Sequence, residues 1–356
     1  MDDIRRIRHT ANHFKRLQSF AEGWESNLDS VDIHAHYFPK TVLKKLGQED
    51  PRIATELKTN GLVIELQIGK HEYSGKVSPG FIDSEEIVSD TKKQGVSKRV
   101  LSLAPESLFY EFPAELAAEA CRRCNDFVAD LAEKHRDILA AMACVPLQSP
   151  DAAAAELERS VRDLGLKGVE IAPNVNGKNF DDKSFSVFFK KVEQLGVPIF
   201  VHPLYVASAE RLANYNLENY CGLPIETTVG AATIIFGGVL RDYPNLKIIL
   251  AHAGGFLPYQ IGRFDHGFLA RADSRTRIQE KPSTYFKKLY FDTITHNRDA
   301  LNFLILKAGV DHVVMGSDYP FDMAYDDPVG VVQSLDMDSS AKEIIGGETA
   351  RKLFRL

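Results

Sequence analysis

The stretch from Val31 to His36 reads VDIHAH, and it decides the fold that we expect for this chain. Successive side chains of a β-strand point to opposite sides, so a strand here would direct His34 and His36 to the same point in space. Two imidazoles at one strand end supply half of a metal site, because such sites usually need four ligands. Other parts of the chain must supply the rest.

Three further apolar runs each end in a residue that can bind a metal ion. They are Val197–His202 (VPIFVH), Leu246–His252 (LKIILAH) and Val313–Asp318 (VVMGSD). Polar groups at the ends of parallel strands gather on the C-terminal rim of a (β/α)8 barrel. One such His or Asp is commonly a satisfied polar group or a helix cap. Four runs with the same ending favour a metal-dependent enzyme site.

Strand and helix signals alternate along most of the chain, which predicts an α/β fold. Eight strands separated by helices favour the (β/α)8 TIM barrel over a doubly wound sheet. The predicted strands are 31–36, 99–104, 138–146, 167–172, 197–201, 246–251, 289–294 and 313–318. The predicted helices are 83–94, 115–135, 151–164, 182–195 and 224–242.

The chain of 356 residues is expected to hold one barrel domain, 31–356, after an N-terminal extension, 1–30. The extension could form a helix with Leu17, Phe20 and Trp24 on one face, and a disordered lead is the alternative. Residues 37–80 contain two glycine-bounded β-type runs and predict a small β insertion after the first strand. An enlarged loop on this rim would cover the active site.

Composition restricts the partners. The net charge is −6 and there is no basic stripe, so we expect a small-molecule substrate rather than nucleic acid. The sequence contains no run of about 20 apolar residues, so we expect no transmembrane helix. The four cysteines are too few for a secreted disulfide framework, which predicts reduced thiols and a cytoplasmic location. Cys121 and Cys124 share a redox-type spacing, but we expect an ordinary helix surface there.

Four strings together resemble the amidohydrolase-related decarboxylases. They are VDIHAHYFP from Val31, IFVHP from Ile199, LKIILAHAGG from Leu246 and VVMGSDYPF from Val313. The resemblance covers the chain from residue 31 onward and implies a barrel of the metal-dependent hydrolase type. It further implies one divalent metal ion, with zinc expected and manganese as the second choice. The ligands implied by the resemblance are His34, His36, His202 and Asp318.

The resemblance also implies roles beyond the metal. His252 corresponds to the family's acid/base residue, and Asp318 is either a ligand alone or also a catalytic proton carrier. Family members form homodimers that share arginines across the interface, and Arg263 and Arg271 match those positions here. Without the resemblance, both arginines would be ordinary helix-surface charges.

The sequence departs from the family pattern in the small β insertion. The family pattern has an arginine shortly after a Gly-Lys pair, whereas this chain reads GKHEYS from Gly69 to Ser74. Lys70, His71 or Lys76 are candidates to replace that charge at the substrate, although lysines on a hairpin are usually only solvated. His296, just beyond the seventh strand, is another candidate substrate contact, or else a surface histidine.

The chemistry leaves two enzymatic alternatives. Loss of CO2 from an sp2 carbon would leave a vinyl or aryl carbanion, so protonation or hydration of that carbon must come first. We therefore expect a metal-dependent, non-oxidative decarboxylase for a small unsaturated or aromatic carboxylic acid, with a metal-bound water and a histidine acid/base. The alternative is a metal-dependent hydrolase of an amide or lactone, although a bridging residue is unclear at Lys167 or Glu170. A catalytically dead barrel is disfavoured by the intact set of five residues.

Overall fold

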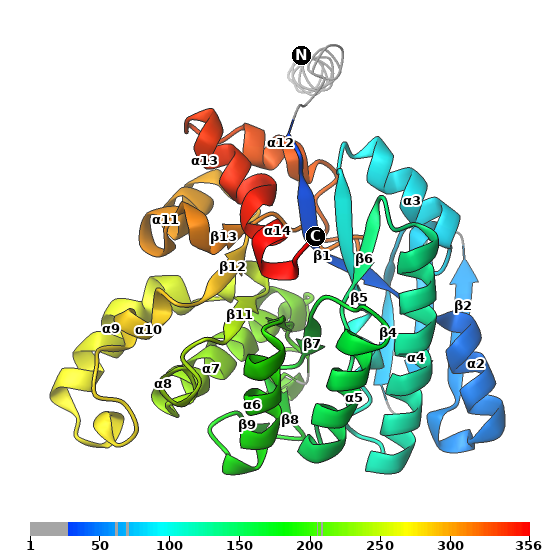
Figure 1. Cartoon of the computed structure of the whole chain (residues 1–356), viewed down its shortest axis with the longest axis horizontal. Helices are drawn as coiled ribbons and strands as arrows, with labels where there is room; N and C mark the ends of the chain where they lie inside the picture. Colours follow the sequence, from blue (N-terminus) through cyan, green and yellow to red (C-terminus); the bar gives the residue numbers. More distant parts are fainter. Residues whose placement is uncertain (1–27, 61–62, 69–70, 205, 208) are drawn as a thin grey trace, which may run out of the picture.

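The computed structural model describes most of the chain, namely residues 28–60, 63–68, 71–204, 206–207 and 209–356. Within these ranges, the strands form the centre of the molecule and the helices surround them (Figure 1). The N-terminal face with Leu17, Phe20 and Trp24 and the predicted contact Lys70 lie outside the described residues.

Eight parallel strands form the centre of the described chain. They pair in the orders β1-β5-β6 and β7-β10-β11-β12-β13. Parallel bridges between Ala143 and Val169 and between Ala35 and Tyr319 join the two sheets at both edges, so the barrel closes. The predicted (β/α)8 fold is confirmed. The strands are β1 (Val31–Tyr37), β5 (Lys98–Leu103), β6 (Leu139–Ala141), β7 (Val169–Ile171), β10 (Pro198–Val201), β11 (Lys247–Leu250), β12 (Tyr290–Asp292) and β13 (Val313–Val314).

The helices form the outer layer, and their ends follow from local chemistry. Asp83 accepts hydrogen bonds from the backbone N–H groups of Glu85 and Glu86 and caps α3. Gly196 ends α6 in the left-handed conformation with φ 65°. The helices are α2 (Lys40–Glu49), α3 (Ser84–Lys93), α4 (Ala114–Lys134), α5 (Pro150–Arg162), α6 (Ser186–Leu195), α7 (Leu223–Phe236), α8 (Val239–Asp242), α9 (Leu257–Ala270), α10 (Pro282–Phe286), α11 (Arg298–Ala308), α12 (Pro328–Gln333), α13 (Ser339–Glu343) and α14 (Thr349–Phe354).

The insertion after β1 begins with α2 and continues as an antiparallel sheet in the order β2-β3-β4. Its strands are β2 (Thr55–Asn60), β3 (Val63–Ile68) and β4 (His71–Lys76). Alternate residues of β3 are buried, as expected for a sheet with one covered face. The ring of Tyr73 on β4 lies 5.6 Å from that of Phe321, which places the insertion beside the segment after β13.

Some details differ from the sequence expectations. The helix predicted over 224–242 is divided into α7 and α8, because Gly238 takes φ 78° between them. The pattern missed α2, β2 and the short hairpin of β8 (Asn174–Val175) and β9 (Lys178–Asn179). Cys121 and Cys124 are buried on α4 rather than on the helix surface. None of the described helices combines the length and apolar character needed to cross a membrane.

Candidate active site

The barrel rim brings together all five residues predicted for the metal and acid/base roles. The metal-binding atoms of His34, His202, His252 and Asp318 lie within 4.8 Å of one another. His36 lies outside that group of four, but its Nε2 is 3.4 Å from Asp318 Oδ1 and its ring centroid is 4.8 Å from that of His202. The strand ends therefore converge as the sequence predicts.

Several polar atoms in this cluster are buried without a hydrogen-bond partner among the described residues. They include Nε2 of His34 and His36, both ring nitrogens of His202, and Oδ1 of Asp318. A buried polar atom without a partner costs about 1–3 kcal/mol, so a protein rarely keeps a group of them without a ligand. Imidazole nitrogens and a carboxylate oxygen form a donor set that suits a divalent transition metal, so these residues fit such an ion.

The charges of the cluster also favour a cation. Burial opposes a proton on His34, but the carboxylates of Asp318 and Asp292 outweigh it and raise the pKa of His34 to about 10. Burial lowers the pKa values of His36 and His202, which keeps both rings neutral, as metal ligation requires. The carboxylates that favour a proton on His34 would also favour a metal ion.

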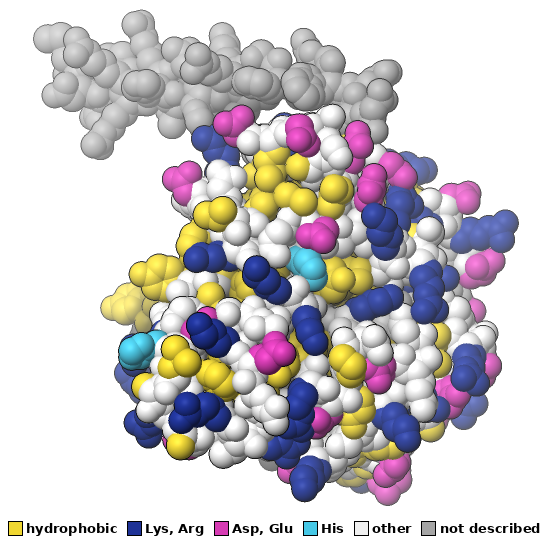
Figure 2. Space-filling model, turned by 60° about the vertical axis from the view of Figure 1, so that its left-hand side comes forward, with side chains coloured by type: hydrophobic (Ala, Val, Ile, Leu, Met, Phe, Trp, Pro, Cys, Tyr) yellow, Lys and Arg dark blue, Asp and Glu magenta, His cyan; other side chains and the backbone are white. Residues whose placement is uncertain are grey.

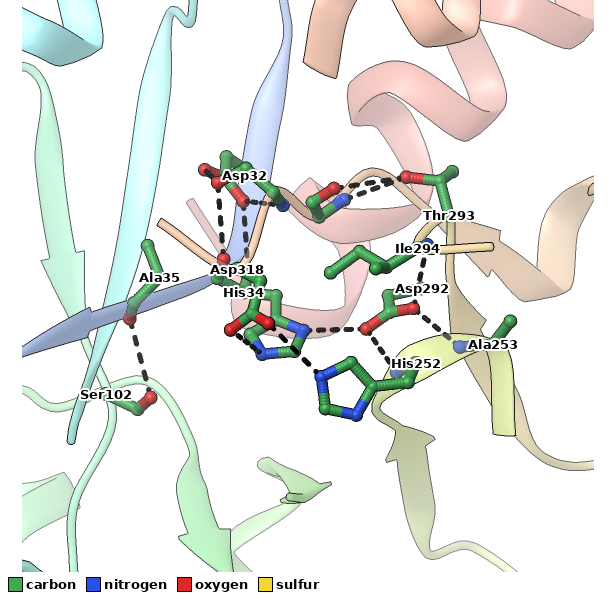
Figure 3. A network of polar contacts seen from close by, with 12 residues as sticks. Asp32, His34, Ala35, Ser102, His252, Ala253, Asp292, Thr293, Ile294 and Asp318 are labelled. Atoms are coloured by element: carbon green, nitrogen blue, oxygen red, sulfur yellow. Dashed lines mark hydrogen bonds and ion pairs between the residues drawn. The ribbon is translucent and has the colours of Figure 1, made fainter. Parts of the chain in front are cut away.

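Hydrogen bonds on the outer side of two rings leave Nε2 free. His36 Nδ1 lies 3.1 Å from the carbonyl oxygen of Leu103 and 3.0 Å from Ser102 Oγ. His34 Nδ1 lies 2.7 Å from Asp292 Oδ2 (Figure 3). Such contacts fix the ring tautomer in metal sites. Sequence reasoning missed Asp292, because the predicted strand 289–294 continues past it, whereas β12 ends at this residue.

Three residues at the site adopt left-handed backbone conformations. His252, His296 and Asp318 have φ values of 52°, 52° and 65°. Such a conformation costs a non-glycine residue about 1–3 kcal/mol, and it persists where the surrounding structure holds it in place. These conformations turn the side chains at the ends of β11, β12 and β13 toward the rim.

A cavity of about 610 Å³ opens beside the cluster, with His252 and Asp318 in its wall. This volume lies in the range typical of small-ligand sites. Apolar and aromatic side chains form much of the remaining wall, including Leu223, Phe256, Tyr259, Ile294, Phe303, Leu304 and Met323. The predicted contact His296 also lines it, and its ring lies 4.9 Å from that of Tyr325.

The predicted arginines do not line this cavity. Arg263 is exposed on α9, and the same helix contributes Tyr259 to the cavity wall. Arg271 follows α9 and lies 3.5 Å from Asp273 in an exposed ion pair.

Hydrophobic side chains also reach the surface in several places among lysines and arginines, as the face in Figure 2 shows. Those at the cavity mouth and on nearby helices include Tyr220, Phe256, Tyr259, Leu269 and Leu306.

Glu170 lies behind a predicted ligand rather than beside the free ligand atoms. Its Oε1 is 3.8 Å from His36 Nδ1, the nitrogen that faces the Leu103 carbonyl. Burial raises the pKa of Glu170 well above its usual range. Glu170 therefore faces the outer nitrogen of His36, and Lys167 precedes β7 at the opposite strand end.

A protein-family model described as amidohydrolase matches residues 31–356. The chain belongs to this family. It is 33% identical to the 2-amino-3-carboxymuconate-6-semialdehyde decarboxylase of Dictyostelium discoideum, covering 92% of this chain and 91% of the relative. The comparison supports the predicted class of enzyme, a carboxy-lyase of the amidohydrolase superfamily.

Solved structures share the fold of this amidohydrolase. The 5-carboxyvanillate decarboxylase of Sphingomonas paucimobilis matches with a TM-score of 0.79 and 23% identity, covering 93% of this chain and 100% of that one. A dihydroxybenzoic acid decarboxylase from Polaromonas sp. JS666, solved with bound manganese and 2-nitroresorcinol, matches with a TM-score of 0.76 and 23% identity. That match covers 92% of this chain and 97% of the other.

Proposed function

We propose that this protein removes CO2, without oxidation, from a small unsaturated or aromatic carboxylic acid. One observation carries the proposal: a buried cluster of histidine and aspartate atoms, without hydrogen-bond partners in the described part of the chain, adjoins a largely apolar cavity. The aromatic walls suit a flat ring or conjugated chain, because stacked and edge-on contacts between π systems are favourable. The decarboxylase names of the relatives support the same class of substrate.

The metal ligands in this proposal are His34, His36, His202 and Asp318. A divalent ion bound there would neutralise the substrate's negative charge and polarise an oxygen atom or a water molecule. Zinc and manganese are both candidates, and manganese is the ion bound in the Polaromonas structure.

The cytoplasmic location predicted from the cysteines remains a prediction, and the four free thiols are compatible with it.

His252 is the proposed acid/base residue. Its ring lines the cavity, and its Nε2 lies 3.3 Å from Asp318 Oδ2. A protonated His252 could donate its proton to the carbon that bears the carboxylate. That carbon becomes tetrahedral, and the electrons of the breaking C–C bond then return to the ring or conjugated chain as CO2 leaves. Asp318 would stabilise the cationic form of His252 before the transfer.

The substrate carboxylate needs a further cation in this proposal. No lysine or arginine is among the described residues that line the cavity. We therefore extend the proposal to a homodimer, in which Arg263 and Arg271 reach the partner's cavity. The planar guanidinium suits bidentate binding of a carboxylate. Exposed hydrophobic side chains around the mouth, such as Tyr259 at 79% exposure, support a covered surface there.

Metal analysis followed by a substrate screen tests the proposal. Purified protein loaded with Zn2+ or Mn2+ would be incubated with unsaturated and aromatic carboxylic acids, and CO2 release would be measured. We expect CO2 in stoichiometric yield with a decarboxylated product. Cleavage of amides or lactones without CO2 would instead establish the hydrolase alternative. Full metal loading with neither reaction would indicate a binding protein.

A further inference from the structure

The carboxylate of Asp292 contacts both a predicted metal ligand and the backbone that carries the predicted acid/base histidine (Figure 3). Its Oδ2 lies 2.7 Å from His34 Nδ1 and accepts the backbone N–H of His252 at 2.8 Å. Its Oδ1 accepts the N–H groups of Ala253 at 2.7 Å and Ile294 at 3.0 Å. Asp292 is fully buried. Both carboxylate oxygens therefore have two donor neighbours each.

We propose that Asp292 is a positioning residue that sets the tautomer of His34 and the location of His252 together. A carboxylate only accepts hydrogen bonds, so His34 must donate from Nδ1, and Nε2 is the nitrogen that a metal ion can bind by displacing its proton. His34 Nε2 lies 3.2 Å from Asp318 Oδ1, inside the ligand cluster. The metal role rests on the proposed site, but it does not depend on the reaction that the site performs.

The same carboxylate holds an unfavourable turn. His252 and Ala253 are consecutive residues with φ values of 52° and 57°, in the left-handed region that L-residues rarely adopt. The two N–H groups of this turn both donate to Asp292. Hydrogen bonds to a charged acceptor are stronger than those between neutral groups. Asp292 can therefore offset the cost of the turn that directs His252 toward Asp318.

Asparagine at position 292 would keep the shape and remove the charge. Its NH2 group must replace one of the two oxygens and then faces two donors. The backbone N–H groups beside Oδ1 cannot become acceptors, whereas His34 can, by moving its proton to Nε2. We therefore expect the NH2 group on the His34 side. That arrangement blocks the lone pair of His34 Nε2 and removes the acceptor of the His252 N–H.

Competition between the protein and a coloured chelator for Zn2+ measures the first effect. In full-length Asp292→Asn we expect metal affinity to fall by about 10–100-fold. With metal at saturation, we expect kcat to fall by about 10-fold or more with a smaller change in KM. Asn125→Ala is the control, because it removes an equally buried hydrogen-bonding side chain on α4. It should lower the melting temperature without changing metal affinity or kcat per bound ion.

Unchanged metal affinity and unchanged kcat in Asp292→Asn, with or without a lower melting temperature, would overturn the proposal. Gly316→Ala provides a second variant if Asp292→Asn does not fold. A Cβ atom at position 316 would come within 2.8 Å of His34 Cβ and 3.1 Å of Asp292 Cβ, so it would displace the pair while keeping the carboxylate. It should weaken metal binding and turnover in the same directions. Wild-type protein that binds metal without releasing CO2 would reject the proposed function, yet weaker metal binding by Asp292→Asn would still support the role of Asp292.

Discussion

Two sides of the barrel rim carry buried carboxyl groups in opposite electrostatic states. Beside β11 to β13, Asp292 accepts hydrogen bonds from four neighbours, and the charge of His34 and the hydrogen bond of His252 hold the pKa of Asp318 well below its usual range despite its burial. Beside β5 and β7, burial raises the pKa of Glu170 well above its usual range and that of Glu106 to about 7. The charge of His34 and a contact with Ser102 offset the burial of Glu170 only in part.

The difference shows that burial alone does not determine the charge of a carboxyl, because nearby positive charge and hydrogen-bond donors can outweigh it. The side with Asp292 and Asp318, which we call the donor-rich side, is anionic and suits a cation. The side with Glu106 and Glu170, which we call the donor-poor side, is close to neutral and adds little repulsion toward a substrate carboxylate. One rim can therefore hold a metal ion and accept an anionic substrate.

The largest expected effect comes from removing charge or ligands on the donor-rich side. His34→Ala and Asp318→Ala should each abolish both activity and stoichiometric metal, because each removes an atom of the ligand cluster. Elemental analysis of the purified variants checks the metal. His312→Ala is a matched control, since His312 lies outside the cluster and contacts the Leu289 carbonyl. Full metal occupancy in both site variants would refute the ligand assignment.

His252 tests whether the donor-rich side also performs proton transfer. His252→Ala should keep its metal, while its turnover falls by about 100-fold or more, the usual scale for a positioned acid or base. Parallel metal analysis and kinetics distinguish the two roles. Loss of metal in this variant would make His252 a ligand, which its place in the cluster of four permits.

The sequence predicts the side of the rim whose residues end regular strands. His34, His202, His252 and Asp318 each close an apolar run, so strand periodicity and barrel geometry bring them together. The opposite side is less predictable. Glu106 lies in a short 3-10 turn, Pro105–Ser107, and its protonation depends on burial that no local pattern encodes. The α2 helix and β2 strand were missed for a similar reason, because both lie in an insertion that barrel alternation does not govern.

Arg263 tests whether an arginine from a second subunit completes the substrate cavity. Arg263→Ala should raise KM for a carboxylate substrate by about 10-fold, the scale of one exposed charge-assisted contact, and leave the metal in place. Mixing this variant with His252→Ala should restore activity, because a mixed dimer has one site with an intact His252 and a donated Arg263. At substrate concentrations far below KM, where Arg263→Ala alone is weakly active, an equal statistical mixture would recover about a quarter of wild-type activity. No rescue in a mixture shown to exchange subunits would leave Arg263 as a surface charge.

Glu106 tests the donor-poor side, with the smallest expected effect. In the folded protein its carboxyl titrates near pH 7, whereas Glu ordinarily titrates near 4.5. The folded state therefore holds a proton that the unfolded state has released. That proton stabilises the fold at low pH, and its contribution is lost as pH rises from about 4.5 through about 7.

Glu106→Gln does not titrate, so its free energy of unfolding should fall less between pH 5 and pH 8, by on the order of 1–3 kcal/mol. Urea unfolding of the metal-free proteins measures this difference, and Glu170, present in both, cancels from it. Glu133→Gln is the control, since that side chain is 75% exposed. Parallel pH curves for wild type and Glu106→Gln would show that Glu106 is ionised in the folded protein, and the contrast between the two sides of the rim would then rest on Glu170 alone.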